Sequence, residues 1–209
     1  LHMYKIYARP GSGNAAVEAL MSELGVAHEV IIVDRDEQKR FPESFRAKNP
    51  MMQVPALELP GGAMMTESAA MMIYLADLHP EKKLAPAPTA PERAQYLRWM
   101  VFLAAAIYST DLLYFYGQRF STDPSHGPGI KAKAGAEMHR LFGVFSEALG
   151  AGPHVLGKTF SAVDIYAAML LSWAPEPEAL FARYPNLKAL ADLVAARPAI
   201  APVWKRNEM

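Results

Sequence analysis

The hydrophobic pattern before residue 80 changes repeatedly between short apolar runs and helical spacing. Apolar residues three and four apart indicate a helix that Gly25 ends, whereas the continuous β-branched run at 29–33 is typical of a strand buried on both faces. Pro60-Gly61-Gly62 marks a tight turn between two short strands. The predicted elements are, in order, a strand at 4–7, a helix at 15–24, a strand at 29–33, a weak helix at 42–47, strands at 54–59 and 63–65, and a helix at 68–78.

The strand patterns stop after residue 80. Residues 80–91 contain four prolines and few apolar side chains, which is typical of a linker. Helical spacing then predicts helices at 92–120, 130–149, 163–173 and 186–196, with a loop at 121–129. We therefore predict an α+β domain of order βαβαββα at 3–79, a linker at 80–91, and an all-α domain at 92–209.

Composition narrows the possible classes of function. The 209 residues carry 21 basic and 21 acidic side chains, so no surface for nucleic acid is expected. The longest uninterrupted apolar run, 99–108, has half of the roughly 20 residues that a bilayer span requires, and no signal-peptide pattern opens the chain. The chain has no cysteine, and its six histidines show no metal-ligand spacing. We expect a cytoplasmic protein without a metal, nucleic acid or membrane as partner.

A short glycine motif supports a competing interpretation. Gly11-x-Gly13-x-x-Ala16 follows a strand and opens a helix, and Asp34 ends the next strand, as in the dinucleotide-binding fingerprint. That fold needs a third parallel strand, whereas Pro60-Gly61-Gly62 predicts an antiparallel hairpin. The nucleotide-binding interpretation is therefore disfavoured.

Two pairs of residues flank the predicted hairpin. Val54-Pro55 begins one strand, and proline cannot donate to a ladder, so the backbone there can be available to an extended ligand. Glu67-Ser68 stand at the start of the helix at 68–78, whose first N–H groups attract a carboxylate. Each pair alone also fits an ordinary edge proline or helix N-cap. Together they can hold a small peptide with an α-amino acid head, such as glutathione.

Longer motifs contain these pairs. They are Asn49-Pro50-x-x-Gln53-Val54-Pro55, Thr66-Glu67-Ser68-Ala69-Ala70 and, late in the chain, Gly157-Lys158-Thr159-Phe160-Ser161-Ala162-Val163-Asp164. This succession resembles the cytosolic glutathione S-transferase superfamily, in its bacterial type, over nearly the whole chain. The resemblance implies a thioredoxin-like first domain and a helical domain from Glu92 onward. It also implies that Ser161 and Asp164 form a buried capping box, which is a structural motif.

The resemblance implies how reduced glutathione would be held. The implied binding residues are Lys39, Gln53, Val54, Pro55, Glu67 and Ser68. The Val54 backbone would pair with the cysteinyl unit, with Pro55 in the cis form. Glu67 and Ser68 would hold the γ-glutamyl head, and either Gln53 or Lys39 would reach the glycyl end.

The catalytic group is implied to follow the first strand, where the family places a Tyr, Ser or Cys that donates toward the glutathione sulfur. Gly13 occupies the position of the cysteine, with Ser12 and Asn14 on either side. Ser12 and Asn14 are equal candidates, and Tyr7 is the third. Such a donor favours the thiolate near neutral pH, since a free thiol has a pKa of about 8.5.

The second domain is expected to hold the electrophile. The candidate pocket residues are Tyr108, Asp111, Leu112, Tyr114 and Tyr116. A methionine-rich stretch at 51–72 is expected to supply core and a homodimer interface. The expected activity is a detoxification-type conjugation of glutathione to small apolar electrophiles. A glutathione-dependent disulfide reductase or peroxidase, and a noncatalytic glutathione-binding module, are the alternatives.

Overall fold

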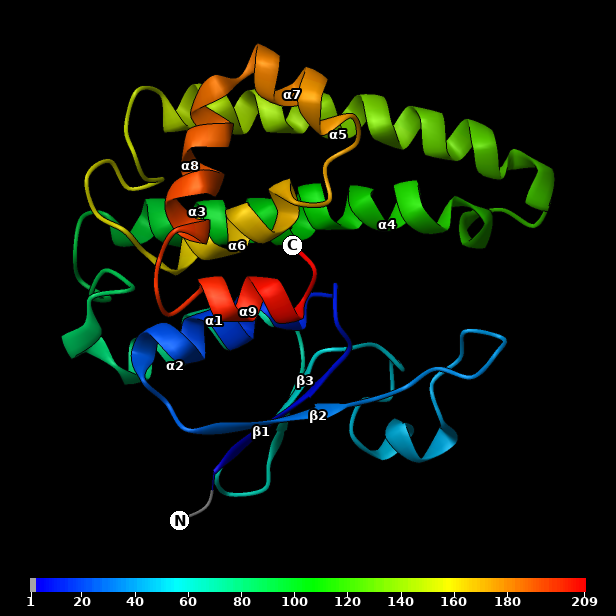
Figure 1. Cartoon of the computed structure of the whole chain (residues 1–209), viewed down its shortest axis with the longest axis horizontal. Coiled ribbons are helices and arrows are strands. Elements are labelled where there is room, and N and C mark those ends of the chain that lie inside the picture. Colours follow the sequence, from blue (N-terminus) through cyan, green and yellow to red (C-terminus); the bar gives the residue numbers. More distant parts are fainter. Residues whose placement is uncertain (1–2) are drawn as a thin grey trace. The chain divides into compact units, whose positions relative to one another are not determined.

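The computed structural model describes residues 3–209, which form two compact units (Figure 1). The first unit contains the chain up to Ala87 together with Ala195–Met209, and the second contains Pro88–Val194. Residues 195–209, which the sequence pattern places in the helical domain, therefore group with the first unit. Each unit is described separately below.

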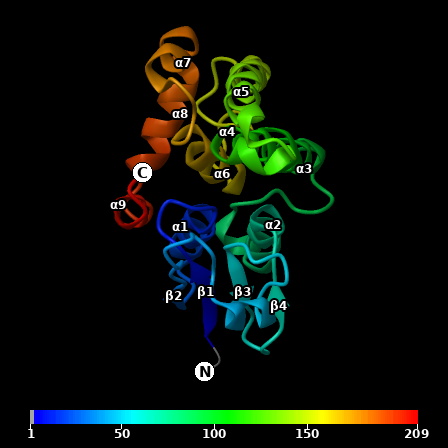
Figure 2. The same ribbon diagram turned by 90° about the vertical axis from the view of Figure 1, so that its right-hand side faces the viewer.

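The first unit is a mixed four-stranded sheet of order β2-β1-β3-β4, which Figure 2 shows nearly edge-on. The strands are β1 (Tyr4–Ala8), β2 (His28–Ile32), β3 (Ala56–Glu58) and β4 (Met64–Met65). β1 pairs in parallel with β2 and antiparallel with β3, which pairs antiparallel with β4. The Pro60-Gly61-Gly62 turn closes this hairpin, with the Gly62 N–H donating to the Leu59 carbonyl over 2.8 Å. The antiparallel hairpin is confirmed, and the parallel continuation of a nucleotide-binding sheet does not occur here.

Helices cover both faces of this sheet. α1 (Asn14–Leu24) and α2 (Ser68–Leu78) pack together on one face, where Ile6, Ala8 and Leu57 are fully buried. The short 3-10 helix η1 (Glu43–Ala47) stands where the sequence predicts a weak helix. Its Phe45 forms a second apolar cluster with Val33, Phe41 and Ala56. Another 3-10 helix, η2 (Pro80–Lys82), follows α2.

The prediction that the strand at 29–33 is buried on both faces is wrong. β2 lies at the edge of the sheet, and its residues are only half-buried or exposed, with Ile32 50% exposed. A continuous β-branched run reports a preference for the extended backbone, and edge strands share that preference with central ones. The number of neighbouring strands depends on the sheet topology, which the run itself does not encode.

The second unit is helical. Its elements are α3 (Arg93–Phe102), the π-helical segment η3 (Leu103–Tyr108), α4 (Ser109–Tyr116), η4 (Gly117–Phe120), η5 (Pro124–His126), α5 (Gly127–Leu149), α6 (Ala162–Leu171), α7 (Pro177–Arg183) and α8 (Pro185–Ala195). The predicted helix at 92–120 is thus one long helix with a π-helical centre. α7, and α9 (Ala201–Arg206) in the first unit, have no counterpart in the sequence prediction. The α+β plus all-α fold class is confirmed.

The long helix Arg93–Phe120 meets the length and composition requirements of a membrane span. It has 28 residues and a mean hydropathy of 1.3 over its most apolar window. Within the second unit, however, its α3 and η3 segments contact α6, and its α4 segment runs along α5. The central helix of a helical bundle passes the same two criteria, so length and composition alone support no membrane assignment.

Candidate functional site

Strand register brings the predicted glutathione-binding residues to one end of the first unit's sheet. Tyr7 pairs with Ala56, so Val54 lies two residues beyond the last pair of the β1–β3 ladder. Leu57 pairs with Met65, so Glu67 and Ser68 follow β4 at that same end. β1 also ends there and leads into the turn that contains Ser12. These segments therefore converge because of strand pairing.

The backbone at Val54 is free at this end of the sheet. The Val54-Pro55 peptide bond is cis, and the Val54 N–H and C=O have no hydrogen-bond partner within residues 3–209. Asn49, 3% exposed, fixes the preceding loop by donating to the Gln53 carbonyl over 2.7 Å and accepting from the Met51 N–H over 2.9 Å. A backbone segment with a free N–H and C=O is what an extended peptide needs in order to pair.

Glu67 has a strained backbone next to a helix N-terminus. Its φ is +67° and its ψ +99°, a region that non-glycine residues rarely adopt. Such outliers persist where the surrounding structure holds them, and they cluster at ligand sites. Glu67 is the N-cap residue of α2, yet its side chain makes no capping hydrogen bond and stays exposed. Its carboxylate can therefore receive an ammonium group, while the start of α2 at the buried Ser68 favours an anion.

Ser12 lies in the turn between β1 and α1. The Ser12 residue is half-buried, and its hydroxyl has no hydrogen-bond partner among the described residues. Its carbonyl accepts from the Ala15 N–H over 3.0 Å, which fixes the turn at the first residues of α1. The N-cap position, Gly13, supplies no side chain. The Ser12 hydroxyl is thus a fixed donor without a partner.

Asn14 lies in different surroundings, although it is only two residues away. Its side chain is fully buried, and its amide nitrogen donates to Glu18 Oε1 over 2.7 Å and to Asn207 Oδ1 over 3.0 Å. Its Oδ1 accepts from the Arg9 N–H over 3.1 Å. Both amide hydrogens are therefore in use, and Asn14 has none to offer a sulfur in this structure. The sequence treats Ser12 and Asn14 as equal, whereas the structure separates them.

Tyr7, the third catalytic candidate, directs its hydroxyl to another side chain. The hydroxyl donates to Glu58 Oε2 over 2.9 Å, and the Lys48 ammonium reaches the same oxygen over 2.9 Å. Lys48 and Tyr7 lower the pKa of Glu58 to about 2 by hydrogen bonding to its charged form. Tyr7 also packs against the Phe45 cluster. Its hydroxyl therefore serves a contact within the protein.

The two candidates for the glycyl end of glutathione have exposed side chains. Lys39 lies in a tight turn that Asp36 and Arg40 close, at a φ of +61°. The Lys39 ammonium has no partner within residues 3–209. Gln53 precedes Val54 directly and is exposed. Both can offer donors to a carboxylate, and Gln53 lies nearer the Val54 backbone along the chain.

The predicted electrophile residues lie on two faces of the long helix in the second unit. Tyr108 contacts Trp173, with ring centroids 5.5 Å apart, and Asp111 and Leu112 are one turn further along. Tyr114 packs instead toward α5, where its ring lies beside Gly135. Arg119 lies over the ring of Tyr116 at 4.2 Å. Tyr114 and Tyr116 thus make contacts different from that of Tyr108.

Asp111 is unusual among these residues. It follows Met100, Leu103 and Ile107 in the buried stripe of the helix and is 4% exposed. Its Oδ1 is buried without a hydrogen-bond partner in the described chain. Burial raises the pKa of this carboxyl to about 7. A carboxyl therefore occupies a position where the helix pattern predicts an apolar side chain.

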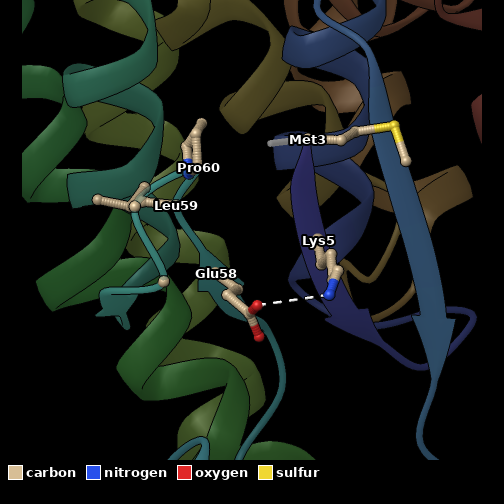
Figure 3. Close-up of a pocket in the computed structure, with 7 residues that line it drawn as sticks. Met3, Lys5, Glu58, Leu59 and Pro60 are labelled. Atoms are coloured by element: carbon tan, nitrogen blue, oxygen red, sulfur yellow. Dashed lines mark hydrogen bonds and ion pairs between the residues drawn. The ribbon is translucent and has the colours of Figure 1, made fainter. Parts of the chain in front are cut away.

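A shallow hollow lies at the other end of the first unit's sheet (Figure 3). Its volume is about 480 Å³, and it is lined by Met3, Lys5, Glu58, Leu59, Pro60, Gly61 and Gly62. The hairpin turn and the start of β1 form it, whereas Val54 and Glu67 lie beyond the opposite ends of these strands. The hollow is therefore separate from the predicted glutathione site.

Several polar residues of this region carried no signal in the sequence. Glu18 and Asn207 accept from Asn14, and Arg206 donates to Glu18. Glu58 accepts from both Tyr7 and Lys48. Their partners are up to 193 positions apart in the chain. No local pattern reports such a contact. Only Glu18, a charge on the apolar face of a helix, departs from the pattern of its surroundings.

Comparisons with known proteins agree with this geometry. Residues 7–83 match the family model for the glutathione S-transferase N-terminal domain, and residues 130–206 match that for the C-terminal domain. The GST-like protein YncG of Escherichia coli K12 is 29% identical, over 99% of this chain and 100% of its own. Glutathione S-transferase GstA of Escherichia coli O157:H7 is 25% identical over 94% of each chain. A glutathione transferase homologue from Sulfitobacter, solved with bound glutathione, has a TM-score of 0.89 at 25% identity over 100% of both chains.

Proposed function

This chain belongs to the cytosolic glutathione S-transferase superfamily, and we propose that it conjugates reduced glutathione to small apolar electrophiles. The proposal rests on the arrangement of residues at one end of the first unit's sheet. There the unpaired Val54 backbone precedes β3 and the strained Glu67 follows β4, and these two strands pair with each other. The glutathione bound to the Sulfitobacter homologue supports the same ligand.

In the proposed complex the peptide lies as a short additional strand. Its cysteinyl unit pairs with the Val54 N–H and C=O, and its γ-glutamyl carboxylate lies at the start of α2. Glu67 accepts from the γ-glutamyl ammonium group, which it can do because its side chain is exposed. The glycyl carboxylate takes donors from Gln53 or Lys39. Of these groups, the Val54 backbone and the Lys39 ammonium have no hydrogen-bond partner among the described residues.

Ser12 is the proposed donor to the glutathione sulfur. Its hydroxyl has no partner among the described residues, whereas the Asn14 amide and the Tyr7 hydroxyl already donate to other side chains. A donor fixed by the turn stabilises the thiolate, and the thiol proton leaves to solvent. The thiolate then forms a carbon–sulfur bond, and the leaving group departs from that carbon with its electron pair. This chemistry needs no covalent step on the protein.

The electrophile is proposed to bind through the second unit. Tyr108, Asp111 and Leu112 of the long helix are the first candidates, while Tyr114 and Tyr116 remain secondary candidates. The proposal also includes a homodimer. Met51 and Leu78, which are 67% and 47% exposed, are apolar side chains of the first unit that a second chain would cover in this homodimer.

Ligand-dependent stabilisation tests the binding step. Millimolar glutathione is expected to raise the Tm, because a ligand that binds only the folded state adds RT ln(1 + [L]/Kd) to its stability. NAD at the same concentration is the matched control and is expected to leave the Tm unchanged. Stabilisation by NAD alone would contradict the proposal.

Product analysis tests the reaction. Chloride release and thioether formation with a chloronitrobenzene are expected for the transferase. Activity only with a mixed disulfide of glutathione would establish the reductase alternative. Binding without either activity would establish the noncatalytic alternative.

Ser12→Ala is expected to lower kcat/KM for conjugation about hundredfold, the typical effect of removing one fixed donor to a developing anion. The pH at which bound glutathione ionises should rise, as followed by the ultraviolet absorbance of the thiolate. Ser22→Ala, at the opposite end of α1, is the matched control and should leave both quantities unchanged. If Tyr7→Phe abolishes activity and Ser12→Ala does not, the assignment to Ser12 is wrong.

A further inference from the structure

A buried polar network joins α9 to the start of α1 within the first unit. Asn207 Oδ1 accepts from the Asn14 amide over 3.0 Å, and the same amide donates to Glu18 Oε1 over 2.7 Å. Arg206 donates to Glu18 Oε2 over 3.1 Å. Asn14, Glu18 and Asn207 are at most 2% exposed. We call this set, with Arg9, the α1–α9 network.

The network extends into the turn that holds Ser12. Asn14 Oδ1 accepts from the Arg9 N–H over 3.1 Å, so one side chain bonds both α9 and the residue that follows β1. Gly11 lies beside the Asn207 backbone, and a β-carbon at Gly11 would be 3.6 Å from the Asn207 carbonyl oxygen. Gly11 has a φ of +71°, which favours glycine. Asn207, at the end of α9, is therefore bonded to Asn14 on one side of Ser12 and lies beside Gly11 on the other.

The Asn207 side chain has its own orientation fixed. Its amide nitrogen donates to the Val203 carbonyl one turn earlier in α9, over 3.1 Å. Its Oδ1 consequently faces Asn14. Buried polar groups that satisfy one another specify a single geometry, and removing one member leaves its partner unsatisfied. Arg206 plays a different part, because it balances the charge of the buried Glu18 from a side chain that is 53% exposed.

We propose that Asn207 is a positioning residue for catalysis, which acts through Asn14 to fix the turn that carries Ser12. The inference rests on the proposed function for its catalytic consequence. Asn207 touches no reacting atom. It determines where the Ser12 hydroxyl lies, and thereby how well the site favours the glutathione thiolate. A segment at the far end of the sequence thus controls the first catalytic turn.

The same segment offers a matched control at the other end of α1. Arg197 binds Glu23 through two hydrogen bonds of 2.6 and 2.9 Å. This ion pair joins residues 195–209 to α1, as the network does, but at the end of α1 remote from Ser12. Loss of either contact weakens the attachment of the segment. Only loss of the Asn207 contact should disturb the turn.

The test compares Asn207→Ala with Arg197→Gln. Asn207→Ala is expected to weaken glutathione binding about tenfold, which corresponds to about 1.4 kcal/mol. It should also raise the pH at which the bound thiol ionises, with kcat falling as well. Arg197→Gln should change glutathione affinity by no more than about twofold, because this ion pair holds the end of α1 that is remote from Ser12. Calorimetric titration and the pH profile of thiolate absorbance measure these quantities.

Coupling between substitutions at Asn14 and Asn207 distinguishes a positioning role of Asn207 from simple destabilisation of the protein. The double variant Asn14→Ala with Asn207→Ala should have nearly the same affinity as Asn14→Ala alone, because Asn14→Ala already removes the bond to Asn207. Additive losses, or an Asn207→Ala protein that binds and ionises glutathione like Arg197→Gln, would overturn the inference. If Asn207→Ala does not fold, Arg206→Ala replaces it, and unchanged affinity in that variant counts against the network.

Amide hydrogen exchange without glutathione separates this inference from the proposed function. Exchange at residues 9–13 should become faster in Asn207→Ala and stay unchanged in Arg197→Gln. If the wild-type protein fails to bind glutathione, the proposed function fails, while faster exchange still supports control of the turn by α9. Equal exchange in both variants would overturn that control whatever the ligand.

Discussion

Asp111→Asn is expected to stabilise the folded protein at pH 8 by about 4 kcal/mol, and by only about 1.5 kcal/mol at pH 5. The wild-type carboxyl is 4% exposed, and its Oδ1 has no hydrogen-bond partner in the described chain. An unpaired buried carboxylate is costly because it loses its hydration without compensation. The neutral amide has nearly the same shape and no charge to bury.

The direction in which stability changes with pH follows from the pKa values of Asp111 in the folded and the unfolded state. Burial raises the folded-state pKa to about 7, from a reference value of 3.8 for an exposed aspartate. Below pH 3.8 the carboxyl is protonated in both states and adds no penalty. Between the two values the folded state holds a proton that the unfolded state has lost, so stability falls as pH rises. Above pH 7 the full penalty is present.

Chemical denaturation of both proteins at pH 5 and pH 8 measures this difference. Asp123→Asn, in the same unit, is a control for which the opposite change in stability is expected. Asp123 is exposed, and hydrogen bonds from Ser125 lower its pKa, so its removal should lose stability at neutral pH. If the difference in stability between wild type and Asp111→Asn is the same at pH 5 and pH 8, the Asp111 carboxyl is not the titrating group.

Asp164→Ala is expected to destabilise the second unit by about 3–5 kcal/mol, which is the range for breaking a buried charged hydrogen-bond network. Asp164 is fully buried. Its carboxylate accepts from the Ser161 N–H over 2.7 Å and from the Val155 N–H over 2.8 Å. Alanine would leave both buried N–H groups without an acceptor. It would also release the loop before α6 from the helix that follows it.

Ser161→Ala is the matched comparison at the same capping box. It removes the side chain that caps the N–H of Asp164 but retains the Asp164 carboxylate. Loss of one N-cap costs about 1 kcal/mol, so this variant should be the milder of the two. Thermal unfolding followed by circular dichroism checks the order. Equal losses would show that the two backbone bonds of Asp164 contribute little.

Several elements of the fold followed from local sequence. Gly25 ends α1, the Pro60-Gly61-Gly62 turn closes the hairpin, and the Ser161–Asp164 capping box starts α6 as predicted. Each signal acts over a few residues, through backbone geometry or a short hydrogen bond, so it can be read from neighbouring positions. The location of Val54 and Glu67-Ser68 at the same end of the sheet also follows from the hairpin, because the turn fixes the register of β3 and β4.

The three catalytic candidates have contacts that the sequence did not show. Ser12 and Asn14 are two residues apart, yet one hydroxyl is free and one amide is fully bonded. Tyr7 donates to Glu58, which lies 51 positions away. A hydrophobic pattern shows that a face is buried, and it does not identify the side chain that a polar group on that face will meet.

The sequence by itself determined the order of elements as far as α2 and the antiparallel hairpin. These depend on local backbone preferences and on the spacing of apolar side chains. Only the tertiary structure decided that β2 is an edge strand, that α9 folds with the first unit, and that Asn207 holds the turn containing Ser12. Those features depend on contacts between residues far apart in the chain, which form only when the whole unit is packed.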